Sequence, residues 1–125
     1  MDYITGMGFD AIWISPIVEN YRQDYHGYAA KNIYKLNPNF GTEDDFKEMI
    51  KKCHEKNIWV MVDVVANHMG NLDENFTENV PFNSKEHFHD FCEISGDDFQ
   101  KKNQERIENC RLARLADLKQ ENEYV

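Results

Sequence analysis

The sequence predicts an α/β fold in which the strands run parallel. The prediction rests on two short apolar runs rich in strand-forming residues and on a helical pattern between them. The first run, residues 11–16, ends at a proline, and the second, residues 58–65, is almost wholly apolar and β-branched. Strands buried on both faces of a parallel sheet have this composition. Together, strand, helix and strand predict a βαβ unit.

The segment between the two runs divides into a loop and a helix. Residues 21–41 are polar, aromatic and punctuated by glycine, which predicts mostly loop. A helix should start at Thr42, because its hydroxyl can cap a free amide and the acidic residues that follow favour the positive end of the helix dipole. Apolar residues then recur at helical spacing and form one stripe, which makes the last of them a small core residue. They are Phe46, Met49, Ile50 and Cys53.

Two strands cannot complete a sheet. A βαβ unit alone leaves strand edges unpaired and one face uncovered. Residues 69–114 turn polar and have no clean periodicity, so they supply no further strands of this kind. We therefore expect the chain to be part of a larger structure, although its 41% hydrophobic residues would support a core of its own.

Charge and hydropathy exclude two classes of partner. The formal net charge of −9 provides no basic stripe to neutralise phosphates, so nucleic acid is not expected. No apolar stretch approaches the roughly 18 residues of a membrane helix, and the N-terminus does not resemble a signal peptide. Residues 75–77, Asn-Phe-Thr, match the acceptor pattern for N-linked glycosylation and hint at a secretory route.

Polar residues follow the second predicted strand directly. Asp63, Asn67 and His68 come after an apolar run, at the carboxyl end of that strand. Ligands of parallel α/β proteins bind at this end, because the loops diverge there. The three side chains are therefore candidates for a binding or catalytic site.

Residues 63–68 read Asp-Val-Val-Ala-Asn-His and resemble a signature block of the α-amylase family, glycoside hydrolase family 13. The order and spacing of five such elements are similar to those of the family, in particular of secreted fungal-type α-amylases. The five elements are residues 8–16, 24–28, 37–42, 63–68 and 115–118.

The resemblance implies a fragment of a (β/α)8 TIM barrel that carries its second and third strands. Residues 1–68 would belong to the barrel, and residues 69–114 would form the irregular, calcium-binding domain inserted after the third strand. Residues 115–125 would return to the barrel.

The resemblance also implies a role for single residues near the substrate. His26, Tyr28 and His68 match positions that line the subsite of the glucose next to the scissile bond. A tyrosine ring can pack on a sugar face, and neutral histidines can hydrogen-bond to hydroxyls. Asp63 matches an aspartate that organises the active site without cleaving the bond.

A calcium site and a disulfide follow from the same resemblance. Asn67, Glu108 and Asp117 match ligands of the family's structural Ca²⁺, and oxygen donors of these types suit that ion. A further ligand, a backbone carbonyl, would come from beyond Val125. Cys92 and Cys110 match a disulfide pair of the inserted domain, worth about 3 kcal/mol in the chain-entropy model.

The implied activity of the parent protein is hydrolysis of internal α-1,4-glucosidic bonds in starch or glycogen, with retention at the anomeric carbon. The parent is expected to be monomeric and extracellular or secretory. Its nucleophile, acid/base and stabilising aspartate would follow later strands, beyond Val125. We therefore assign no catalytic residue to this chain and expect it to be inactive by itself.

Three alternatives remain open from the sequence. The parent could be another member of family 13, an α-glucosidase or a transglycosylase, which product analysis would distinguish. The chain could be a non-catalytic remnant that binds carbohydrate or calcium, which calorimetry would test. An unrelated acidic α/β domain would have to match five ordered motifs by chance.

Overall fold

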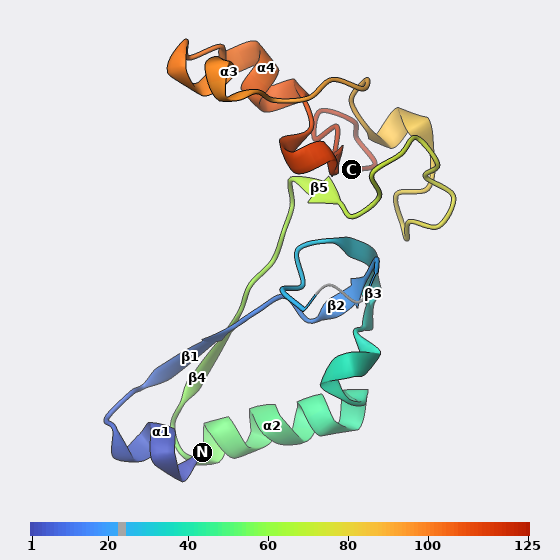
Figure 1. Ribbon diagram of the computed structural model, residues 1–125. Coiled ribbons are helices and arrows are strands. Elements are labelled where there is room, and N and C mark those ends of the chain that lie inside the picture. The colour runs from blue at the N-terminus through green and yellow to red at the C-terminus, as the bar shows by residue number, and fades with distance from the viewer. Residues whose placement is uncertain (23–24) are drawn as a thin grey trace.

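The computed structural model describes residues 1–22 and 25–125, arranged in two parts along one long axis (Figure 1). The first part contains α1 (Asp2–Gly6), β1 (Ala11–Ile14), β2 (Val18–Asn20), β3 (Ala30–Leu36), η1 (Pro38–Phe40), α2 (Glu43–Glu55) and β4 (Trp59–Val62). The second contains β5 (His68–Met69), η2 (Lys85–His87), α3 (Gly96–Gln100), α4 (Gln104–Asn109), η3 (Leu112–Arg114) and β6 (Ala116–Asp117).

The predicted βαβ unit is confirmed. Strands β1 and β4 pair in parallel, from Ala11 opposite Trp59 to Ile14 opposite Val62. Helix α2 precedes β4, and in Figure 1 its C-terminal end meets the start of that strand while the rest of the helix diverges from the strand pair. The unit brings the carboxyl ends of both strands to the same edge, toward the second part of the molecule.

Helix α2 begins where the sequence predicts. The Thr42 hydroxyl accepts a hydrogen bond from the Asp45 amide at 3.2 Å, and the Asp45 carboxylate accepts one from the Thr42 amide at 2.8 Å. This reciprocal capping box satisfies two of the free amides at the helix start. The apolar stripe turns inward, and Cys53 at its end is fully buried.

The prediction of mostly loop over residues 21–41 is wrong for part of that segment. Residues 30–36 form strand β3, which pairs antiparallel with β2 through an irregular register. The strand carries two lysines and an asparagine, and Ala30 is its one buried residue, so neither its composition nor an alternating pattern reveals it. Its other edge receives Val80, whose carbonyl accepts from the Ile33 amide at 3.1 Å.

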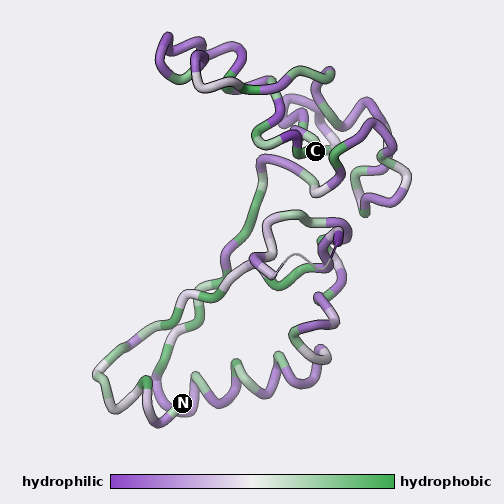
Figure 2. Tube along the Cα trace, viewed as in Figure 1, coloured by the Kyte–Doolittle hydropathy of each residue, from purple (hydrophilic) through white to green (hydrophobic). Residues whose placement is uncertain are grey.

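The expected burial of β4 on both faces is also not met. Trp59 is 75% exposed and Met61 56% exposed, whereas Val60 and Val62 are half-buried. Helix α2 covers one face, and nothing within the described residues covers the other. Figure 2 shows hydrophobic stretches along both strands of the pair.

The main core lies in the second part of the molecule, around the short β5–β6 ladder. His68 pairs with Asp117 and Met69 with Ala116, so residues nearly 50 positions apart in sequence lie side by side. The buried apolar side chains of this cluster come from β3, β5, β6 and the loops between them. They are Ala30, Met69, Phe76, Phe88, Ala116 and Leu118.

A disulfide joins Cys92 and Cys110, the pair expected from the sequence, across 18 residues. It closes the part of the chain that contains the short helices α3 and α4. Cys53 is the free cysteine of the chain and is buried, as its place on the apolar stripe predicts. Among the described residues, no helix is long and apolar enough to cross a membrane.

Candidate functional site

Asp63 and Tyr28 meet at the carboxyl end of the parallel strands. Asp63 follows β4 directly, and its amide donates to the carbonyl of Ile14 at 2.9 Å, which extends the ladder by one step. The Tyr28 hydroxyl donates to Asp63 Oδ2 at 3.0 Å. This hydrogen bond raises the pKa of Tyr28. The tyrosine ring stays 41% exposed, so one face can still receive a ligand.

His68 lies on β5, directly beside this pair. Its Nε2 is 3.0 Å from the carbonyl oxygen of Tyr28, which can only accept, so Nε2 carries the proton. Its Nδ1 then accepts from Asn67 Nδ2 at the longer distance of 3.3 Å. Burial lowers the pKa of His68, which keeps the ring neutral. Tyr28 therefore joins Asp63 and His68 through two different atoms.

His26 supports Tyr28 from the same loop. Its Nδ1 accepts from the Tyr28 amide at 3.0 Å, and the two rings stack with centroids 5.8 Å apart. The structure thus brings together all four residues predicted near the substrate. Asp24, which belongs to the same sequence motif, lies outside the described residues.

Asn67 and Asp117, two of the three predicted calcium ligands, lie together. Asn67 Nδ2 donates to Asp117 Oδ1 at 3.3 Å, on the two sides of the β5–β6 ladder. Asp117 is 3% exposed, and burial raises the pKa of its carboxyl. A buried carboxylate of this kind is stabilised by a nearby cation.

The third predicted ligand has a different setting. Glu108 lies exposed on α4, and its carboxylate accepts a hydrogen bond from Gln104 one turn earlier on the same helix. No recorded contact within the described residues links Glu108 to Asn67 or Asp117. Those residues also contain no group of three or more His, Cys, Asp or Glu side chains that could hold a metal ion.

His89 is a neighbour of the Asp117 carboxylate that the sequence does not reveal. Its Nδ1 lies 2.7 Å from Asp117 Oδ2, and its Nε2 lies 3.1 Å from Glu121 Oε1. The His89 amide also donates to the Asp117 carbonyl, so the backbone holds the ring in place. No spacing in the sequence signals this contact, because it depends on the return of the chain at β6.

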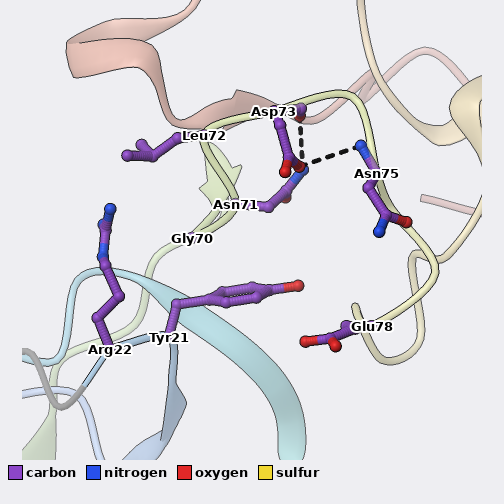
Figure 3. A pocket seen from close by; sticks show the side chains of 8 residues that line it. All are labelled: Tyr21, Arg22, Gly70, Asn71, Leu72, Asp73, Asn75 and Glu78. Atoms are coloured by element: carbon purple, nitrogen blue, oxygen red, sulfur yellow. Dashed lines mark hydrogen bonds between the residues drawn. The ribbon is translucent and has the colours of Figure 1, made fainter.

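A polar cavity of about 310 Å³ lies beside the core, between residues 21–22 and 70–78 (Figure 3). Its wall is held by a chain of hydrogen bonds that also escapes sequence analysis. The Tyr21 hydroxyl donates to Asn79 Oδ1 at 2.8 Å, and Asn79 Nδ2 donates to Asn71 Oδ1 at 2.9 Å. Asn71 Nδ2 in turn donates to the carbonyl of Asp73 at 3.0 Å.

Replacing Tyr21 with phenylalanine should lower the free energy of unfolding by about 1–3 kcal/mol, because it leaves the fully buried Asn79 Oδ1 without a donor. The measurement is urea unfolding followed by circular dichroism. Tyr34→Phe, at a tyrosine that is 76% exposed, is the matched control and should leave the midpoint unchanged. Equal midpoints for both variants would contradict the role of this hydrogen bond.

The same tyrosine should make the stability of the folded protein decrease at alkaline pH. Burial raises the pKa of Tyr21 from 10.0 to about 12. Between these values the unfolded chain releases the phenolic proton and the folded chain retains it. Stability should therefore fall as the pH rises from about 10 to 12, and the Tyr21→Phe variant should lack this part of the fall.

Comparison with known proteins agrees with the fold. The family model for the α-amylase catalytic domain matches residues 1–117. The α-amylase of Saccharomycopsis fibuligera is 44% identical over 135 aligned positions, which cover 100% of this chain and 27% of the relative.

Two solved structures are similar over nearly the whole chain. An α-amylase from Malbranchea cinnamomea has a TM-score of 0.86 at 40% identity, over 98% of this chain and 28% of its own. An α-amylase from Geobacillus thermoleovorans, complexed with acarbose, has a TM-score of 0.81 at 38% identity, over 97% of this chain and 26% of its own.

The architecture is thus that of a fragment of a TIM barrel, which carries a pair of adjacent parallel strands and the helix between them. The chain belongs to the α-amylase family of glycoside hydrolases. It spans about a quarter of the length of the relatives that it matches.

Proposed function

We propose that the whole protein to which this chain belongs hydrolyses internal α-1,4-glucosidic bonds of starch or glycogen, with retention at the anomeric carbon. Retention needs a nucleophilic carboxylate and a general acid about 5 Å apart. By the family resemblance, both would be supplied by later barrel strands, together with the stabilising aspartate. The 125 residues of this chain would position the substrate without cleaving it.

The observation that carries this proposal is the cluster of Tyr28, Asp63 and His68 at the strand ends. The hydroxyl of Tyr28 is held by Asp63 at 3.0 Å and its carbonyl by His68 at 3.0 Å, so the exposed ring has a fixed orientation. A fixed aromatic face can pack against a glucose ring at little entropic cost.

The neutral ring of His68 would supply a hydrogen bond to a sugar hydroxyl. At His68 the Asn67 contact is the longer of its two hydrogen bonds, 3.3 Å against 3.0 Å, so Nδ1 is the nitrogen that can most easily exchange its partner. His26 has its Nδ1 engaged by the Tyr28 amide.

Kinetics of the full-length enzyme on a maltooligosaccharide test this assignment. Tyr28→Phe keeps the ring and removes the hydrogen bond to Asp63, and His68→Ala removes the ring that orients Tyr28. Each variant should lower kcat/KM roughly tenfold or more. The control is His54→Ala, at an exposed histidine on α2, which should behave as the wild type. Site variants that match this control would refute the proposed subsite.

Product analysis on the same enzyme tests the reaction type. Hydrolysis with retention would release shortened maltooligosaccharides whose new reducing ends are initially in the α-configuration, as seen by proton magnetic resonance. Predominant formation of longer or cyclic products would instead assign the protein to a transglycosylase of the same family.

We also propose that Asn67 and Asp117 contribute to a structural calcium site. The residues fit this ion in kind, since an amide side chain and a buried carboxylate lie side by side. The amide nitrogen of Asn67 now faces Asp117, so the amide oxygen is the atom that would bind the ion. Calcium takes six to eight oxygen donors, so most of the shell would have to come from water and from other parts of the protein. Glu108 remains a proposed ligand whose present hydrogen bond to Gln104 would have to be released.

Calcium should stabilise the full-length protein, and Asp117→Asn should abolish most of this effect. At a calcium concentration one hundred times the dissociation constant, the expected stabilisation is about 2.7 kcal/mol. Thermal unfolding with calcium and with a chelator measures it. Glu108→Gln is the informative comparison, because an unchanged calcium response would remove Glu108 from the proposed ligand set. A wild type that is indifferent to calcium would refute the site.

The remaining proposals concern organisation and location. Residues 1–68 would belong to the barrel, residues 69–114 to an inserted domain, and residues 115–125 to the return. The β5–β6 ladder supports this division, because it pairs the point of departure with the point of return. The parent would be a monomer that works outside the cell, which agrees with the disulfide.

A further inference from the structure

The loop that follows β5 carries Asn75, Phe76 and Thr77, the one stretch of the sequence that matches Asn-x-Ser/Thr with x other than proline. We propose that the side-chain amide of Asn75 is the attachment point of an N-linked oligosaccharide. The inference rests on the secretory location proposed above and is independent of the enzymatic activity.

Phe76, the middle residue of the motif, determines which side chains of the motif are exposed. Phe76 is 5% exposed and stacks on Phe88 with ring centroids 4.3 Å apart, within the main core. Its neighbours Asn75 and Thr77 are both exposed. The buried ring therefore anchors the loop, and the acceptor residue and its hydroxyl partner are displayed on the surface.

The hydrogen bonds of the loop leave the reactive nitrogen available. Asn75 Oδ1 accepts from the Thr77 hydroxyl at 2.7 Å and from the Thr77 amide at 3.3 Å. A backbone amide can only donate, so the atom facing it must be the oxygen of the Asn75 side chain. Nδ2 then points away from Thr77 and has no hydrogen-bond partner within the described residues. Attaching a sugar at Nδ2 breaks neither of the two hydrogen bonds that Asn75 Oδ1 accepts from Thr77.

The order of the chain allows modification before folding. Three core partners of Phe76, namely Phe88, Ala116 and Leu118, all lie later in the sequence. The loop therefore enters the secretory compartment before its anchor can pack. After folding, Asn75 lies on the rim of the polar cavity with Tyr21 and Glu78 (Figure 3), so an attached oligosaccharide would cover the mouth of that cavity.

A second observation points to the same compartment. The disulfide between Cys92 and Cys110 forms and persists in oxidising environments such as the endoplasmic reticulum. N-linked oligosaccharides are added to proteins that pass through the secretory pathway. The exposed acceptor asparagine and the disulfide are therefore both consistent with passage of the protein through the secretory pathway.

The chemical step is a substitution at an anomeric carbon. The donor is an oligosaccharide linked to a lipid through a diphosphate. A bond forms between Asn75 Nδ2 and the first sugar carbon, the bond from that carbon to the diphosphate oxygen breaks, and the amide loses one of its two protons. The lipid diphosphate leaves with the bonding electron pair, and nothing is oxidised or reduced.

Translation of the 125-residue chain behind a cleavable secretion leader, in the presence of endoplasmic-reticulum microsomes, tests the proposal. Chains protected from added protease should migrate as the size of one oligosaccharide above the unmodified chain. Treatment with peptide-N-glycosidase should reverse the shift and convert Asn75 to aspartate, which peptide mass spectrometry locates.

Variants separate the motif from its surroundings. Asn75→Gln removes the acceptor, and Thr77→Val keeps the shape of the threonine but removes its hydroxyl, so both should lose the shift. Thr77→Ser should retain it in part. Asn83→Gln, at an exposed asparagine outside the motif, is the matched control and should keep it fully.

Protease-protected wild-type chains without a shift would overturn the proposal, as would a shift that survives in Asn75→Gln. None of these readouts involves starch or calcium. A failure here would therefore leave the proposed hydrolase activity standing, and a failed hydrolase assay would leave this result standing.

Discussion

Gly70→Ala should destabilise the protein by about 3 kcal/mol or more, because the added methyl group has no space. A Cβ atom at this position would lie 2.2 Å from the carbonyl oxygen and 2.3 Å from the carbonyl carbon of Ala29. Both atoms belong to the backbone, so no side-chain rotation can relieve the overlap. The Gly70 amide also donates to the Ala30 carbonyl at 2.7 Å, and the substitution would have to lengthen this hydrogen bond.

The displacement would reach the candidate site, because Ala29 follows Tyr28 and Gly70 follows β5. Unfolding in urea, followed by circular dichroism, measures the loss. Gly96→Ala is the matched control, since a Cβ atom there meets nothing within 4 Å and the residue lies at the start of α3. Alanine should be neutral or slightly stabilising at that position. If both variants unfold at the same urea concentration, close backbone contact at Gly70 is not important for stability.

Arg111→Ala should cost about 3–5 kcal/mol, because Arg111 is a large side chain that is only 1% exposed. Its guanidinium lies over the Phe91 ring at 4.7 Å, and Nη1 donates to the carbonyl of Asp73 at 3.2 Å. The same Nη1 is 3.4 Å from the carbonyl of Arg114. Truncation would open a cavity between three segments and leave buried carbonyls without a donor.

Arg111→Met separates packing from charge. Nε and Nη2 of Arg111 are buried and have no hydrogen-bond partner among residues 1–22 and 25–125, and burial lowers the pKa of the guanidinium. Two of the three guanidinium nitrogens are thus unsatisfied, and replacing such a buried charged residue with an apolar one of similar volume is often neutral or stabilising. We expect Arg111→Met to unfold within about 1 kcal/mol of the wild type. A loss as large as that of Arg111→Ala would mean that the guanidinium itself is required.

The elements that the sequence predicts correctly are those with local signals. The apolar runs that become β1 and β4 and the capping box at Thr42 are contained in a few neighbouring residues. Strand β3 has no such signal. Residues 30–36 become a strand through pairing with β2 and with Val80, and these partners cannot be read from the segment itself.

The candidate site shows the same division. The position of Asp63, Asn67 and His68 after a strand predicts a site, but the hydrogen bond between Tyr28 and Asp63 joins residues 35 apart in sequence. The family resemblance places both residues near the substrate but implies no contact between them. His89 and Arg111 were missed, because a histidine or arginine gives no sign in sequence that it will be buried. The roles of single site residues, including Glu108, stay predictions.

The two-residue ladder between β5 and β6 makes the stretch from residue 70 to residue 115 a closed excursion. Its ends are held at β-sheet spacing, so extra residues in its exposed turns need not move β5 and β6 apart. Each doubling of a flexible loop costs only about 0.6 kcal/mol in closure entropy. The excursion can therefore accept insertions in its exposed turns while Asp63 and His68 stay in place, provided that Phe76, Val80 and Phe88 keep their contacts with the rest of the chain.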